Sequence, residues 1–187
     1  EQRHGIAGGF FMWKVGGARA AKGGSLDDVI ASAQNVVNRT KSICVGLEPC
    51  VIPALGHSNF KIEDGTMEFG VGHHGEAGTK VEKLKSASEM AQEMAETILN
   101  DFDFEEGKED AVMLSSLGAT PVMELYVLYD EVEKVLAKAG HKVWKTYIGN
   151  YVTSLDMNGA SLTIVDLDDE IKELLSEPAV PIGMKNY

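Results

Sequence analysis

Basic residues, cysteines and long apolar runs are all scarce in this chain of 187 residues. The 17 Lys and Arg residues stand against 29 Asp and Glu residues, and the net charge of −12 opposes non-specific binding to nucleic acid or to an anionic membrane. No run of about 18 apolar residues occurs and no secretory signal pattern is present, so we expect no membrane-spanning helix. These shortages predict a cytoplasmic protein whose partners are small molecules or proteins of locally matched charge.

Cysteine is limited to Cys44 and Cys50, and the two do not form a CxxC pair. HxxxH and HExxH spacings are missing as well, so the sequence predicts no metal site. The cysteine spacing is compatible with a disulfide. Thiols in apolar surroundings of a chain without a secretion signal are more often buried and reduced, and we therefore predict structural thiols.

Helical and strand patterns alternate along the chain and predict a single α/β domain. Helices are expected over 8–22, 26–40, 86–102, 121–139 and 169–177, and strands over 42–52, 67–74, 111–117, 141–149 and 161–167. Some connections are too short for crossover helices, so the sheet should be mixed.

Helix-start signals support these boundaries. Ser25 and Asp168 are expected as N-caps, Ser86 with Glu89 forms a capping box, and Thr120 is expected to cap a helix that begins at Pro121. The free N–H groups at this last start would also suit an anion, although plain capping explains the pattern.

The stretch MEFGVGHHGEAG, from Met67 to Gly78, carries the clearest candidate chemistry. As the end of a strand it would place His73 and His74 on opposite faces, so only one of them could act at a site. A neutral imidazole held at a strand end is able to act as a nucleophile or a base, and Glu76 stands close enough to orient it. From spacing alone, an ordinary surface or core histidine explains the pattern more simply.

Six segments together resemble a known family. GIAGGFFMWKVGGARA, SLDDVIASAQ, EPCVIPALG, MEFGVGHHGEAG, LGATPVMELYVLY and GNYVTSLDMNGASLTIVDLDDE occur in the family's order and cover nearly the whole chain. In this combination the chain resembles the C-terminal half of the dihydroxyacetone-binding (K) subunit of dihydroxyacetone kinase. Residues 1–187 are therefore expected to form that C-terminal domain.

The resemblance implies a role for one histidine. In the family, the histidine of this glycine-rich motif binds the substrate ketone covalently as a hemiaminal, and it matches His74, whereas His73 falls on a variable position. The resemblance also implies a two-layer α/β domain with a mixed sheet of about six strands and packed helices, and a homodimer.

Two residues depart from the family pattern: Ala77 replaces a proline of the motif and Trp13 replaces a histidine of the first helix. The family's glycine-rich substrate loop and acid–base residues belong to a preceding half that this sequence does not contain, so the chain alone is expected to be inactive.

The absence of a following nucleotide domain favours the phosphoenolpyruvate-dependent system. There, ADP and Mg²⁺ are expected on a partner kinase subunit and no cofactor is expected in this chain. The alternative is a dihydroxyacetone-sensing, kinase-like transcriptional coactivator.

Overall fold

The computed structural model describes residues 6–58, 60–74, 76–101, 107, 109–181 and 184. Its centre is a six-stranded sheet with the strand order β3-β2-β1-β6-β4-β5. The strands are β1 (Thr40–Glu48), β2 (Thr66–Phe69), β3 (Lys80–Lys83), β4 (Glu109–Ser116), β5 (Lys142–Gly149) and β6 (Asn158–Asp166). β4 and β5 are parallel and the other neighbours are antiparallel, which confirms the predicted mixed sheet.

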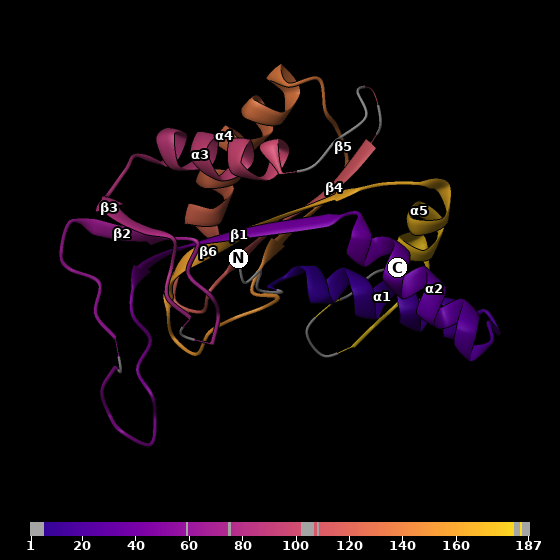
Figure 1. Ribbon diagram of the computed structural model, residues 1–187, viewed down its shortest axis with the longest axis horizontal. Helices are drawn as coiled ribbons and strands as arrows, with labels where there is room; N and C mark the ends of the chain where they lie inside the picture. Colours follow the sequence, from indigo (N-terminus) through magenta and orange to yellow (C-terminus); the bar gives the residue numbers. More distant parts are fainter. Residues whose placement is uncertain are drawn as a thin grey trace.

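Helices lie on both faces of this sheet (Figure 1). They are α1 (Gly8–Ala21), α2 (Leu26–Asn38), α3 (Ala87–Asn100), α4 (Val122–Lys138) and α5 (Asp169–Ser176). α3 and α4 cover one face, and α1, α2 and α5 gather at the other. The sheet and the helices α3 and α4 form two packed layers, and the helices α1, α2 and α5 pack against the other face of the same sheet. The expected α/β class and the helices packed on the sheet are confirmed.

Capping side chains start three of the helices as predicted. The Ser25 and Ser86 hydroxyls accept backbone N–H groups in reciprocal capping boxes, and the Asp168 carboxylate accepts from the N–H of Ile171. Such caps supply partners for the first N–H groups of a helix, which have none inside it.

The predicted cap at α4 is wrong. Pro121 occupies the N-cap position and makes no side-chain cap. The Thr120 hydroxyl instead donates toward Asn158 Oδ1 and the Gly159 carbonyl, each at 2.7 Å, and accepts from the Gly159 N–H. The Thr120 hydroxyl therefore forms its hydrogen bonds with strand β6, and not with the first turn of α4 as the sequence predicted.

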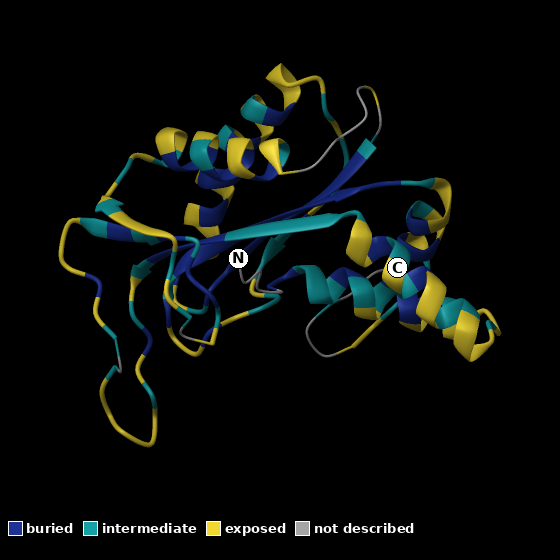
Figure 2. Ribbon diagram, in the orientation of Figure 1, coloured by how far each residue is buried: buried dark blue, intermediate teal, exposed yellow. Residues whose placement is uncertain are grey.

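The neighbouring interior strands β4 and β6 are the most buried part of the molecule (Figure 2). Because helices cover both of their faces, nearly every residue of the two strands is buried, including polar ones such as Ser115, Ser161 and Thr163. Core side chains on the α3–α4 face include Met94, Leu114, Leu125, Leu136, Leu162 and Ile164. This double burial makes the centre of the sheet a rigid base for the segments at its ends.

Strand β3 was not predicted. Its sequence, KVEK, is short and charged, as is common for the edge of a sheet, where charge discourages pairing with other chains. It pairs with β2 and turns the predicted single strand into a hairpin. This hairpin frames the segment that holds His73 and His74.

In the described part of the chain, no helix is long and apolar enough to cross a membrane.

Candidate functional site

The histidine-bearing segment is the connection between β2 and β3. Strand β2 ends at Phe69, where Gly70 adopts φ 78°, a left-handed conformation that glycine tolerates. The predicted continuation of the strand to His74 is therefore wrong, and both histidines lie in a turn. Their rings are neighbours, with centroids 3.8 Å apart and planes tilted by 41°, so alternation does not separate them.

Backbone hydrogen bonds close the base of this turn. The Thr79 N–H donates to the Phe69 carbonyl at 2.8 Å, and the Gly70 N–H donates to the Cys44 carbonyl at 2.7 Å. Across the turn, Glu68 Oε1 accepts from the Gly78 N–H at 2.6 Å. The turn is thus fixed both to its own hairpin and to the neighbouring strand β1.

One carboxylate orients His74. Glu76 Oε2 accepts the His74 backbone N–H at 2.9 Å, and Glu76 Oε1 lies 3.2 Å from His74 Nδ1. An ionised carboxylate only accepts, so Nδ1 is assigned the proton and Nε2 the lone pair. A hydrogen bond from its own backbone N–H first, and then those from His74, hold the pKa of Glu76 below its ordinary value. Glu76 therefore stays ionised and keeps the imidazole in one tautomer.

Gly72 makes room for this carboxylate. A Cβ at Gly72 would overlap Glu76 Oε2, and the Gly72 N–H donates to the Glu76 carbonyl at 2.9 Å. This contact explains why a glycine stands at position 72, because any side chain there would displace the carboxylate that orients His74.

The arrangement presents an imidazole held at Nδ1 and open at its other nitrogen. The His74 side chain is 71% exposed, compared with 33% for that of Glu76. A neutral imidazole of this kind can add to an electrophilic carbon or accept a proton. Within the described residues, no group of three His, Cys, Asp or Glu side chains is placed to hold a metal ion.

The two departures from the family pattern lie in different places. Ala77 is exposed in the same turn, directly after Glu76. Trp13 is 70% exposed on α1, where it lines an apolar groove between that helix and the segment around Pro178 and Pro181.

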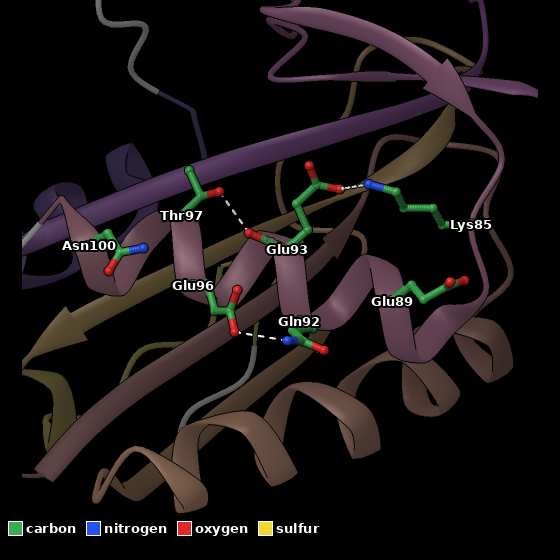
Figure 3. Close-up of a pocket in the computed structure, with 7 residues that line it drawn as sticks. All are labelled: Lys85, Glu89, Gln92, Glu93, Glu96, Thr97 and Asn100. Atoms are coloured by element: carbon green, nitrogen blue, oxygen red, sulfur yellow. Dashed lines mark hydrogen bonds and ion pairs between the residues drawn. The ribbon is translucent and has the colours of Figure 1, made fainter.

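The hollow on the exposed face of α3 is polar and already paired internally (Figure 3). Glu93 accepts from both Lys80 and Lys85, and Gln92 donates to Glu96 at 2.9 Å. Glu93 is therefore engaged in ion pairs, Glu96 accepts from an amide, and the remaining acid, Glu89, accepts from Ser86 in the capping box of α3.

The acidic composition of segment 103–110, DFEEGKED, predicts a solvated connection, but Glu109 and Asp110 belong to strand β4, and of the other residues only Gly107 is among those described.

The two cysteines are buried and unpaired, as predicted. Burial raises the pKa of the Cys44 thiol to about 12. A thiol with such a pKa is not a nucleophile near neutral pH, so Cys44 is a core residue.

A second histidine–carboxylate pair was missed by the sequence analysis. His141 Nδ1 lies 2.7 Å from Asp110 Oδ2, with side chains 11% and 1% exposed. Asp110 also faces Asp166 across β4 and β6, and Asp166 pairs with Arg39. Burial raises the pKa of Asp110 to about 6. No local signal joins residues this far apart in sequence, and only the sheet register brings them together.

Known proteins are similar to this chain in sequence and in fold. The Dak1 domain matches residues 1–182. The dihydroxyacetone-binding subunit DhaK of PTS-dependent dihydroxyacetone kinase 1 from Listeria innocua is 39% identical over 168 residues, which are 90% of this chain and 51% of that protein. The chain spans about half the length of the curated DhaK relatives it matches.

Two solved structures are similar over 95% of the chain. The dihydroxyacetone kinase operon co-activator DhaQ has a TM-score of 0.89 at 30% identity, with 56% of its chain covered. The dihydroxyacetone kinase of C. freundii has a TM-score of 0.85 at 29% identity, with 32% of its chain covered. These matches confirm the resemblance found in the sequence, and the chain belongs to the Dak1 domain family, which includes the dihydroxyacetone-binding kinase subunits.

Proposed function

We propose that this chain is the substrate-binding part of a dihydroxyacetone kinase and captures dihydroxyacetone as a hemiaminal on His74. The observation that carries the proposal is the contact of His74 Nδ1 with Glu76, which leaves Nε2 as the nitrogen with a lone pair on an exposed ring. The same histidine occupies the motif position that the family resemblance assigns to covalent binding.

The proposed step balances without a further reactant. Nε2 of His74 adds to the ketone carbon, and the carbonyl double bond opens to an alkoxide. The ring then carries a positive charge, which Glu76 stabilises at Nδ1. Loss of the Nδ1 proton and protonation of the alkoxide give a neutral hemiaminal with no net change in protons.

Covalent capture selects ketones over polyols. A carbonyl carbon is electrophilic, whereas glycerol has no such carbon and would be held by hydrogen bonds alone. Capture also fixes the terminal hydroxyl, which lowers the entropic cost of in-line phosphoryl transfer. The proposed site thus supplies both specificity and positioning.

The phosphoryl donor belongs to a partner in this proposal. The relative from Listeria innocua is described as PTS-dependent, which supports a phosphoenolpyruvate-dependent system in which a separate kinase subunit carries ADP and Mg²⁺. The family's acid–base residues are expected in the half of the relatives that this chain does not match, so the chain alone should bind without turning over. A cytoplasmic location and a homodimer complete the proposal.

A second candidate is a dihydroxyacetone-sensing coactivator. The structural similarity to DhaQ favours it, because DhaQ is described as an operon co-activator. Both candidates use the same capture step. Transfer of phosphate to captured dihydroxyacetone in the presence of an ADP-loaded kinase subunit would support the kinase, and capture without transfer would support the coactivator.

Carbon-13 NMR of dihydroxyacetone labelled at the carbonyl carbon tests the capture step. With the wild-type protein, we expect the ketone signal to convert to a protein-bound tetrahedral carbon, and His74→Ala should abolish this signal completely. His57→Ala is the matched control, since His57 lies in the loop after β1, outside the motif. A ketone signal unchanged by wild-type protein, or an adduct that survives His74→Ala, would contradict the proposal.

A further inference from the structure

A second imidazole, that of His73, lies against the ring of His74. We propose that His73 is a positioning residue for ketone capture, and that its ring stacks on His74 to hold the nucleophilic nitrogen in its attacking orientation. This inference rests on the proposed function. It assigns a task to a position that the sequence resemblance treats as variable.

The stack supplies a restraint that Glu76 does not. Both hydrogen bonds to His74 come from the same carboxylate, one to the backbone N–H and one to Nδ1. A single ring contact of 3.2 Å at Nδ1 acts as a pivot and leaves the plane of an exposed ring free to swing. The His73 ring, 3.8 Å away between centroids, limits that motion from the face of the imidazole. Together the carboxylate fixes one atom and the stack fixes the plane.

The stack leaves the reactive lone pair accessible. The Nε2 lone pair lies in the plane of the imidazole ring, whereas the two histidines meet through tilted ring faces. A ketone can therefore approach along the ring edge while His73 remains in contact. Orienting a nucleophile before attack contributes to rate and affinity because less conformational freedom is lost in the addition.

The charge state of His73 suits this role. Burial first, and then the neighbouring charge of His74, lower the pKa of His73, while Glu76 opposes the shift. His73 is half-buried, whereas His74 is exposed. A neutral His73 stacks without repelling the positive charge that develops on His74 as it adds to the ketone. Among the described residues, His74 and Glu76 are the titratable groups that act on His73.

Three substitutions of His73 test whether its side chain acts by ring stacking, by filling space or by hydrogen bonding. His73→Phe keeps a flat ring without a titratable nitrogen, His73→Leu keeps bulk without a flat face, and His73→Gln keeps polarity without a ring. The experiment measures the dissociation constant of carbonyl-labelled dihydroxyacetone by carbon-13 NMR at about pH 8, where free imidazole is neutral.

We expect His73→Phe to bind within about twofold of wild type, and His73→Leu and His73→Gln to bind about three- to tenfold more weakly, the range of a lost aromatic contact. Equal binding by the Leu variant would show that His73 only fills space. Wild-type binding by the Gln variant with weak binding by the Phe variant would assign a hydrogen bond instead. Either result overturns the inference while the proposed function stands.

A measurement without ligand keeps the two proposals apart. The proton on Cε1 of His74 should lose a ring-current shift in His73→Leu and retain it in His73→Phe. An unchanged resonance in the Leu variant would overturn the stack itself. If wild-type protein forms no adduct with the ketone, the proposed function fails together with the role of the stack in capture.

Discussion

Two histidine–carboxylate pairs in this molecule have similar chemistry and opposite surroundings. His74 and Glu76 are two residues apart in an open turn, with Nδ1 and Oε1 separated by 3.2 Å. Asp110 lies at the start of β4 and His141 lies between α4 and β5. Their side chains meet at 2.7 Å between Oδ2 and Nδ1, and both are nearly inaccessible. The pKa of Glu76 is lowered by the hydrogen bonds it accepts, whereas burial raises that of Asp110.

This difference shows that the role of a histidine–carboxylate pair depends on its exposure to solvent more than on the two residue types. An accessible imidazole can meet a substrate, and a carboxylate that stays ionised can orient it. A buried pair is unavailable to a ligand, and its carboxyl is costly to ionise, so its contacts serve the fold. Three predictions test this division of roles.

The largest expected effect belongs to the buried pair. Asp110→Ala should lower the free energy of unfolding by about 3 kcal/mol, because it removes the carboxyl group that contacts the His141 ring in a closed site. Urea unfolding at about pH 5, below the folded-state pKa of Asp110, measures the loss, and ketone capture should not change. Glu109→Ala is the matched control: Glu109 is the preceding residue of β4 and forms a surface ion pair with Lys172. If the two variants are equally stable, the buried pair does not stabilise the fold.

The second prediction concerns pH. The folded-state pKa of Asp110 is raised to about 6, so the folded state binds this proton more tightly than the unfolded chain, whose value is about 3.9. The stabilisation that this bound proton gives to the folded state is fully present below the unfolded-state pKa of Asp110. It is lost as the pH rises through the folded-state pKa. Asp110→Asn has no such proton, so its stability relative to wild type should rise by about 2 kcal/mol between about pH 4 and pH 7. Parallel stability profiles for the two proteins would refute this assignment.

The smallest expected effect on stability belongs to the exposed pair. Glu76→Gln should weaken ketone capture about tenfold, because an amide accepts the Nδ1 proton but does not stabilise the positive ring. The free energy of unfolding should change by less than about 0.5 kcal/mol. Glu63→Gln, in an exposed pair with Lys61, is the control. Wild-type capture by the Glu76→Gln variant would show that Glu76 does not orient His74 through its charge.

Much of the fold was predictable because its signals are local. The capping boxes at Ser25 and Ser86 and the helical periodicity that follows them depend on neighbours within one or two turns. Strand β3 escaped prediction because an edge strand needs few apolar residues. Thr120 was misassigned because β6, distant in sequence, competes for its hydroxyl.

The sequence and the family resemblance pointed to the residues of the candidate site but did not predict its geometry. The spacing placed Glu76 near the histidines and the resemblance selected His74, yet a strand was expected where Gly70 takes a positive φ and begins a turn. That change places His73 beside His74, whereas a strand would have placed it on the opposite face. The pairing of His141 with Asp110 depends on sheet register, which a sequence pattern does not reveal.

The closure of the turn at Phe69 and Thr79 has a consequence for protein engineering. The chain enters and leaves the turn at adjacent backbone positions, and the contacts that orient His74 come from within it. The sequence 70–79 is therefore suited to replace the loop of another antiparallel hairpin in a loop-exchange experiment. The host must also offer a carbonyl on the next strand, as Cys44 does for Gly70.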